Sequence, residues 1–291
     1  MPFPIDGVRA GHWTGAATGV TVILLPEGTV GSGEVRGGAP ATREFALLDP
    51  ARTVTRVDAI TFSGGSAFGL ATADGVMRFL AEHGHGFPTA GGVVPIVPAA
   101  CVFDLVDASG PWPTSDDGYS AAAAALRDEP FMTGRVGAGA GATVGKWRGR
   151  QFAAPGGVGV ASLDVDGARV AAIAVVNAIG DVVEADGRVL AGSSAPPDAA
   201  AFPSPAPFEE QSVANTTLVA IVTDARCDKA ACHLVAQSGH DGIARALRPS
   251  HTRFDGDLAI AVATGAVEAH LDRVRLAAAD VAADAIRNAC R

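Results

Sequence analysis

The strongest constraint on the fold of this chain is a junction between two stretches of opposite character. From Ala191 to Pro207 the sequence is rich in Pro, Ala and Ser and shows no apolar periodicity. From Thr217 onward it becomes a run of apolar and β-branched residues, which is typical of a strand buried in a sheet. The sequence therefore predicts a linker that leads directly into a core strand, with Asn215 and Thr216 between them.

This junction places a hydroxyl group beside a peptide bond that it can cut. The Thr216 hydroxyl can attack the carbonyl carbon of Asn215, so that the acyl group moves from nitrogen to oxygen and water then releases a new N-terminal Thr. The freed α-amine can act as the base for the hydroxyl of the same residue. An Asn-Thr pair before a strand is also common in proteins without such chemistry, so the hypothesis depends on the rest of the chain.

The composition excludes several classes of function. The 291 residues carry a net charge of −9 without a basic stripe, so we do not expect a nucleic-acid partner. No aliphatic run approaches the roughly twenty residues of a membrane-spanning helix, and Met1 is followed by Pro-Phe-Pro, so we expect neither a membrane span nor a signal peptide. The 4 Cys residues lack CxxC spacing, which is typical of thiols in a reducing cytoplasm. We expect a cytoplasmic protein with no metal and no other cofactor.

Apolar periodicity predicts a mixed α/β order of elements, and 291 residues could hold one large domain or two ordinary ones. The predicted extended segments are Thr21–Leu25, Val57–Phe62, Pro95–Leu105, Val158–Leu163, Arg169–Val176 and Leu258–Thr264. The predicted helices cover the patterns Phe68–Leu80, Asp116–Arg127, Asp228–Leu247 and Val267–Ala285. Ser66 is the expected N-cap of the first helix.

A Gly-rich run, residues 137–146, ends in Lys146. It does not fit a P-loop, because positions 140 and 147 hold Ala and Trp where that motif needs Gly and a hydroxyl residue. The Gly-x-Gly-x-x-Ala spacing from Gly137 fits a dinucleotide-binding pattern, but no helical pattern follows it, so we discount that interpretation. A backbone with so few side chains can instead bring amide donors, and the lysine, against a substrate.

Asn177 and an acidic pair are the remaining polar candidates. Asn177 follows a predicted strand, where its amide can point into a cleft or simply form a turn. Asp255 and Asp257 are two residues apart, and in an extended backbone such residues share a face. Their carboxylates should couple and can orient an ammonium group, including the α-amine of Thr216. The alternatives are a solvated loop or a cation site, although the further oxygens of a calcium loop are missing.

Taken together, these segments resemble the self-processing DmpA-type aminopeptidases, which include β-aminopeptidases and nylon-oligomer hydrolases. No single motif is decisive, but the joint order is specific and covers nearly the whole chain: residues 61–70, 95–105, 137–146, 175–177, 215–217 and 251–257. The resemblance implies a four-layer α/β/β/α sandwich of the N-terminal-nucleophile-hydrolase type. It also implies a single domain over residues 1–291 that is cleaved into an α chain, 1–215, and a β chain, 216–291. The cleaved units are expected to assemble as a homo-oligomer that is often a tetramer.

The same resemblance implies roles for particular residues. Thr216 matches the nucleophile that cleavage after Asn215 exposes. Lys146 and Asn177 match the positions that polarise the scissile carbonyl and help to stabilise the oxyanion.

The resemblance also assigns the acidic pair and one aromatic residue. Asp255 and Asp257 match the carboxylates that position the amine of the nucleophile, whereas members with Ser-x-Glu differ here. Phe103 is a departure, because many members carry a Tyr near the nucleophile. Any contact assigned to that hydroxyl is therefore in doubt, and we expect Phe103 to line the substrate site.

The leading hypothesis is an amidohydrolase with an N-terminal Thr nucleophile that acts through an acyl-enzyme. Its substrate would be a small aminoacyl amide, a short peptide or an oligomer of ω-amino acids. One alternative is acyl transfer to an amine, as in ornithine acetyltransferase, although the motif around that enzyme's Thr is not apparent. A second alternative is a non-catalytic binder of small molecules with the same fold.

Overall fold

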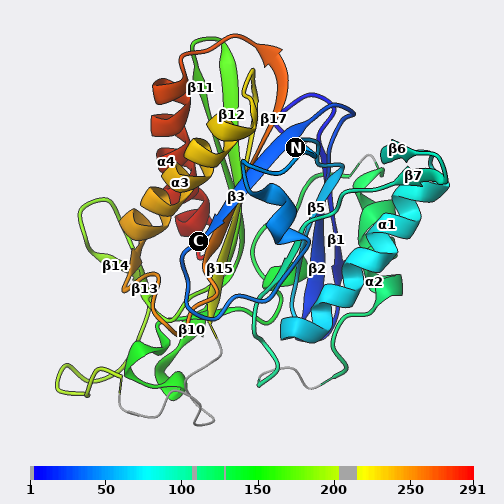
Figure 1. Cartoon of the computed structure of the whole chain (residues 1–291). Coiled ribbons are helices and arrows are strands. Elements are labelled where there is room, and N and C mark those ends of the chain that lie inside the picture. Colours follow the sequence, from blue (N-terminus) through cyan, green and yellow to red (C-terminus); the bar gives the residue numbers. More distant parts are fainter. Residues whose placement is uncertain (1–2, 107–109, 128, 203–214) are drawn as a thin grey trace.

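Two sheets lie face to face in this protein, and a pair of helices covers the outer face of each (Figure 1). The computed structural model describes residues 3–106, 110–127, 129–202 and 215–291. The order of layers is helices, sheet, sheet, helices, which confirms the four-layer α/β/β/α sandwich expected from the sequence.

The first sheet uses strands from the N-terminal part of the chain. In order across the sheet, they are β1 (Arg9–Thr14), β2 (Gly19–Leu24), β5 (Ala59–Ser63), β8 (Ala99–Cys101) and β4 (Thr42–Arg43). All neighbours are antiparallel except β5 and β8, which are parallel. The covering helices are α1 (Thr72–Glu82) and α2 (Ser115–Ala125).

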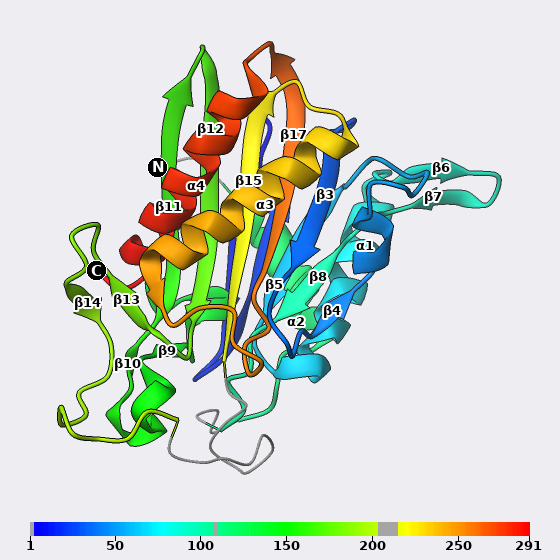
Figure 2. The same cartoon turned by 60° about the vertical axis from the view of Figure 1, so that its left-hand side comes forward.

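The second sheet holds the longest strands and is seen nearly face-on in Figure 2. In order, they are β11 (Gly157–Val165), β12 (Ala168–Asn177), β15 (Thr216–Ala225), β17 (Leu258–Val267) and β3 (Val30–Val35). Helices α3 (Lys229–Ala246) and α4 (Leu271–Asn288) cover its outer face. Strands β15 and β17 are parallel because α3 carries the chain back between them, whereas the other neighbours are antiparallel.

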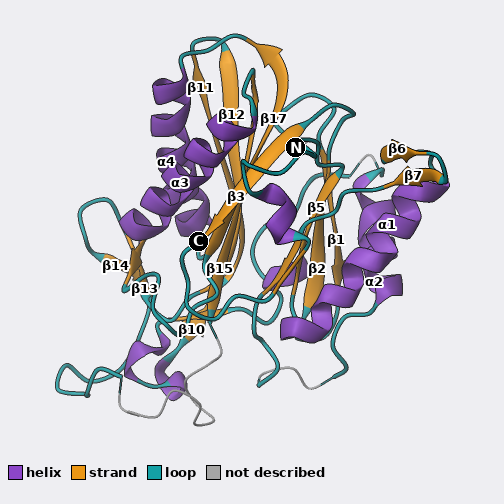
Figure 3. Cartoon of the chain, in the orientation of Figure 1, coloured by secondary structure: helices purple, strands orange, loops and turns teal. Residues whose placement is uncertain are grey.

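The central strands β12 and β15 are continuous apolar runs because both of their faces are buried. One face meets the first sheet, and the other meets α3 and α4, which lie on the opposite side of the molecule from α1 and α2 in Figure 3. Small residues permit this close packing. A Cβ at Gly159 in β11 would lie 2.0 Å from the carbonyl oxygen of Ala285, so only glycine lets α4 approach the sheet so closely.

Apolar side chains fill the three spaces between the four layers. The layer between the sheets holds the large residues, among them Phe62, Ile173, Leu218 and Ile260. The two outer layers, under α1 with α2 and under α3 with α4, are built mainly from Ala and Val. Bulky side chains therefore hold the two sheets together. The helices lie close to the sheets because the residues between a helix and its sheet are small.

Shorter elements surround the ends of the sheets. The strands among them are β6 (Phe87–Thr89), β7 (Gly92–Val94), β9 (Thr143–Val144), β10 (Ala154–Pro155), β13 (Asp181–Val183), β14 (Val189–Ala191) and β16 (Leu247–Arg248). The 3-10 helices are η1 (Phe45–Leu48), η2 (Ser66–Ala71), η3 (Gly137–Gly139), η4 (Lys146–Arg148) and η5 (Arg150–Phe152). The Gly-rich run is thus a chain of short turns, with no helix of the dinucleotide-binding kind.

The predicted strands and helices are confirmed to within a few residues, with two corrections at helix starts. Ser66 is not an N-cap: it begins η2 with φ 53°, and α1 starts only at Thr72, because Gly69 packs against the carbonyl of Gly64 in a tighter turn. Val267 does not belong to the last helix. It ends β17, where it pairs with Ala225 across the sheet, so strand pairing overrides the helical spacing.

The segment Pro95–Leu105 is only partly a strand. Within this segment, strand pairing covers residues 99–101. The preceding part does not form a strand, because Pro95 and Pro98 lack the backbone N–H that a ladder needs. In the predicted linker, Ala191 ends β14, residues 192–202 are irregular or turns, and residues 203–207 lie outside the described residues. Within the described residues, no helix combines the length and the apolar character that crossing a membrane requires.

Candidate functional site

The end of one strand and the start of the next bring two predicted site residues together. Asn177 is the last residue of β12 and Thr216 the first of β15, and the antiparallel register places them opposite each other. Both side chains are buried, at the end of the second sheet that lies near β9 and β10 in Figure 2. The pairing of the two core strands therefore assembles the centre of the candidate site.

The Thr216 hydroxyl lies against the peptide bond that precedes it. Its Oγ1 donates a hydrogen bond to the carbonyl oxygen of Asn215. Gly256 faces the same hydroxyl, because a Cβ at this position would lie only 2.7 Å from Thr216 Oγ1 and 3.0 Å from the carbonyl oxygen of Ala39. The hydroxyl thus occupies a space that exists because residue 256 has no side chain.

The side chain of Lys146 contacts Asn177. Its buried ammonium donates to the carbonyl oxygen of Asn177 at 3.1 Å and to the side-chain Oδ1 at 3.0 Å. Gly145, with φ 75°, turns the chain sharply so that the lysine points inward. A buried ammonium is costly unless oxygen atoms surround it, and the Asn177 oxygens meet that need here.

Three residues from two segments hold the Asn177 side chain in one orientation. Its Oδ1 accepts hydrogen bonds from Lys146 and from the backbone N–H of Thr143 at 3.0 Å. Its Nδ2 donates to the carbonyl oxygen of Phe103 at 2.9 Å. The amide is therefore fixed with its oxygen toward the lysine and its nitrogen toward the first sheet.

Asp255 is a buried carboxylate surrounded by hydrogen-bond donors. Its Oδ2 accepts from the N–H of Thr252 at 3.1 Å and from the Thr252 hydroxyl at 2.6 Å, and its Oδ1 accepts from the N–H of Ile179 at 3.3 Å. Burial, followed by the nearby charge of Asp257, raises the pKa of Asp255 to about 7. The uncut chain thus holds two buried carboxylates close together, and the pKa of Asp255 is raised as a result.

Asp257 contacts the strand that carries the candidate nucleophile. Its Oδ1 accepts from the backbone N–H of Thr217 at 2.7 Å. Its Oδ2 accepts from the backbone N–H of His251 at 2.9 Å and from the ring Nδ1 of His251 at 2.9 Å. The described contact is therefore with the residue after Thr216, and the expected contact with the α-amine of Thr216 stays a prediction.

Two residues near the acidic pair were not singled out from the sequence. Thr252 satisfies Asp255, and the Thr-x-x-Asp spacing that begins at Thr252 is a signal that could have identified it. His251 pairs with Asp257, but nothing in a single sequence indicates that contact. Phe103 is half-buried and contributes its carbonyl to Asn177, so a role for its ring in substrate binding stays a prediction.

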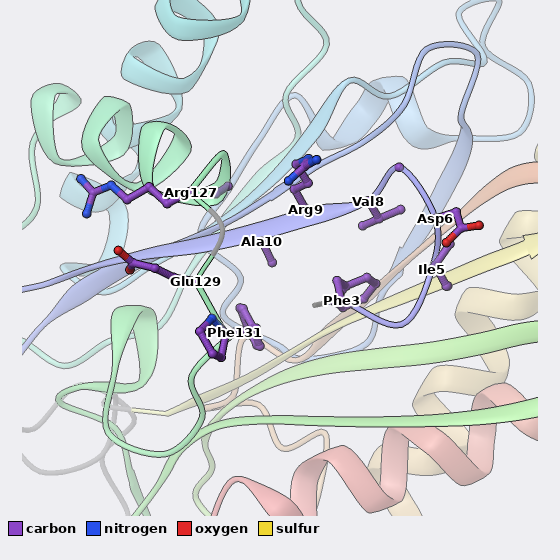
Figure 4. A pocket seen from close by; sticks show the side chains of 12 residues that line it. Phe3, Ile5, Asp6, Val8, Arg9, Ala10, Arg127, Glu129 and Phe131 are labelled. Carbon is purple, nitrogen blue, oxygen red and sulfur yellow. The ribbon is translucent and has the colours of Figure 1, made fainter. Parts of the chain in front are cut away.

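Two cavities lie away from these residues. They have volumes of about 390 Å³ and 700 Å³ and share Phe3, Asp6 and Phe131 among their lining residues. Figure 4 shows the smaller one, with Arg127 and Glu129 on its left side and Arg9 from β1 apart from them. No predicted site residue lines either cavity, so the hydrogen-bond network around Thr216 identifies the candidate site better than cavity volume does. Among the described residues there is also no group of three or more His, Cys, Asp or Glu that could hold a metal ion.

Gly256→Ala is expected to abolish cleavage after Asn215 or to slow it at least tenfold. The new methyl group would lie within contact distance of Thr216 Oγ1 and of a backbone carbonyl, so the hydroxyl must move away from the Asn215 carbonyl. A denaturing gel sampled over time after synthesis measures the rate. Gly91→Ala is the control, because a Cβ at Gly91 would meet no atom closer than 3.8 Å and the residue does not have a positive φ. Cleavage of Gly256→Ala at the parent rate would contradict this geometry.

Comparison with known proteins identifies the family of this chain and agrees with its fold. The family model of peptidase family S58 matches residues 4–291. An uncharacterized aminopeptidase of Mycobacterium leprae is 46% identical, over 91% of this chain and 78% of that protein. A 6-aminohexanoate-oligomer endohydrolase of Paenarthrobacter ureafaciens is 30% identical, over 91% of this chain and 75% of that protein.

In fold, the chain is similar to the L-aminopeptidase D-Ala-esterase/amidase of Ochrobactrum anthropi, described as a variant of the Ntn-hydrolase fold. That similarity has a TM-score of 0.67 and 16% identity, over 98% of this chain and 84% of the other.

Proposed function

The chain belongs to peptidase family S58 and is therefore a hydrolase of amide bonds, and from this premise we propose that its nucleophile is Thr216, freed by self-cleavage after Asn215. The observation that carries the proposal is the Thr216 hydroxyl, buried against the Asn215 carbonyl at the start of a core strand. Lys146, Asn177 and the acidic pair approach the same strand end from other segments.

The cleavage step needs only groups of the chain and one water molecule. Thr216 Oγ1 attacks the carbonyl carbon of Asn215, the C–N bond breaks, and the nitrogen takes up the hydroxyl proton. The resulting ester joins Asn215 to the Thr216 oxygen. Water then hydrolyses the ester, which leaves a carboxylate on residue 215 and both a free hydroxyl and a free α-amine on residue 216.

Turnover repeats the attack on an external amide. The α-amine of Thr216 takes the proton from its own hydroxyl, and Oγ1 attacks the substrate carbonyl. The Lys146 ammonium stabilises the negative charge that develops on the carbonyl oxygen, and Asn177 holds the ammonium in place. A single oxyanion donor contributes on the order of 10²–10³ in rate. The leaving amine departs with a proton, and water releases the acyl group as an acid.

The relatives indicate two kinds of substrate to test. One relative is named an aminopeptidase, and another is named for 6-aminohexanoate oligomers. We propose that the substrate carries a free amine near the scissile amide, because an aminopeptidase cuts the amide that follows a free N-terminal amine. As the resemblance implies, we also propose a homo-oligomer of cleaved units, with a tetramer as the expected state. From the cysteine usage we propose a cytoplasmic location.

The test is a substrate panel measured on purified protein that has been checked for cleavage. The panel contains L- and D-aminoacyl amides, β-aminoacyl amides and 6-aminohexanoate oligomers, and product acids and amines are quantified separately. We expect acid release from at least one class, without any dependence on an added amine acceptor. Product formation only with an acceptor would indicate an acyltransferase, and no turnover of any class would count against the proposed function.

A further inference from the structure

His251 lies between Asp257 and helix α3 of the outer layer. Its backbone N–H and its ring Nδ1 both approach Asp257 Oδ2 at 2.9 Å, and the other oxygen of the same carboxylate accepts from the N–H of Thr217 at 2.7 Å. An ionised carboxylate can only accept hydrogen bonds, so Nδ1 carries a proton in this pair. Two donors on one oxygen restrict the rotation of the Asp257 carboxylate and aim its other oxygen at the strand of the nucleophile.

The backbone and the ring of His251 are both held in place. Its φ of 54° lies in the left-handed region, which a non-glycine residue adopts rarely unless its surroundings require it. The ring stands edge-on to His240 of α3 with centroids 4.9 Å apart, and His240 Nε2 contacts the carbonyl oxygen of Glu34 in β3 at 3.0 Å. Burial lowers the pKa of His240 to about 4, so at neutral pH the His240 ring is uncharged where it packs against the His251 ring.

We propose that His251 is a positioning residue for Thr216, which acts by fixing the Asp257 carboxylate and, through it, the peptide between Thr216 and Thr217. The ring Nε2 is buried and has no hydrogen-bond partner among the described residues, so the orienting contact of the ring is the one through Nδ1. A nucleophile displaced by about 1 Å can lose about 10²-fold in rate. His251 therefore affects both self-cleavage and turnover, and this inference rests on the proposed function.

Two substitutions separate the hydrogen bond from the backbone and from packing. His251→Gly removes the ring but adopts a positive φ without strain. His251→Asn also removes the ring, tolerates the left-handed region, and places its Nδ2 donor close to the position of the histidine Nδ1. We expect His251→Gly to slow cleavage and to lower kcat at least tenfold with KM changed less than threefold, and His251→Asn to recover most of both rates.

Melting temperatures of all three proteins are measured alongside the rates. Both variants lose the same packing against His240, so a purely structural role predicts similar losses of activity in the two. Equal activity of His251→Gly and the parent chain, or equal loss in His251→Gly and His251→Asn, would overturn the inference. If His251→Gly does not fold, His251→Asn is compared with the parent chain alone, and a tenfold loss of cleavage and kcat in a folded His251→Asn would overturn the inference. A parent chain that neither cuts itself nor hydrolyses any amide would instead reject the proposed function, so the two failures are distinguishable.

Discussion

Thr216→Ala is expected to stay a single chain of 291 residues and to hydrolyse no amide, whereas the parent protein separates on a denaturing gel into residues 1–215 and 216–291. Removal of the hydroxyl removes the atom that lies against the Asn215 carbonyl and, with it, both the cleavage and the nucleophile of turnover. The expected loss of activity is complete within the sensitivity of the assay. The mechanism needs a hydroxyl and a free α-amine on the same residue, and Ala at position 216 has no hydroxyl.

N-terminal sequencing and intact mass measure this outcome. The smaller fragment of the parent protein should begin with Thr-Thr-Leu-Val. Thr216→Ser is the matched control, because it keeps a hydroxyl at the same position and should still cut itself. An uncut parent chain with full activity, or a Thr216→Ala chain that retains activity, would rule out the mechanism.

Asp255→Asn is expected to lower turnover at least tenfold and, at the same time, to raise the melting temperature of the uncut chain above pH 7. The folded chain raises the pKa of Asp255 to about 7, from about 3.9 in an unfolded chain. A raised carboxyl pKa means that the folded state binds the proton more tightly, so folding stability falls as the pH rises from about 4 to about 7. Asn carries no charge and escapes this loss, so its advantage is full above pH 7 and disappears toward pH 4.

The measurement is a series of melting curves from pH 4 to 8, made with and without Thr216→Ala. In the cut protein, the α-ammonium of Thr216 is proposed to offset the repulsion between Asp255 and Asp257, so Asp255→Asn should stabilise the cut protein less than the uncut chain. If Asp255→Asn lowers the melting temperature at every pH and loses activity only in proportion to the protein that unfolds, Asp255 is a purely structural residue.

Much of the fold could be predicted because burial leaves a direct record in the sequence. The strands that became β12, β15 and β17 are continuous apolar runs, and the helices α1 and α4 show their apolar spacing clearly. The errors occur where pairing or tight turns decide the local structure. Val267 extends β17 through its partner Ala225, and Ser66 enters a 3-10 turn, although each residue also fits a helical pattern.

The sequence by itself determined the candidate nucleophile, since a hydroxyl residue between a Pro-rich tract and a core strand is a local pattern. Only the tertiary structure decided which partners each site residue has. Residues far apart in the chain meet because the register of β12 against β15 places Asn177 opposite Thr216, and a shift by one residue would reverse every side chain. The hydrogen bonds from Lys146 to Asn177 and from Thr217 and His251 to Asp257 depend on loop packing and on the pairing of β15 with β17. A single sequence records the periodicity of a strand but not its register, because many registers bury the same apolar face.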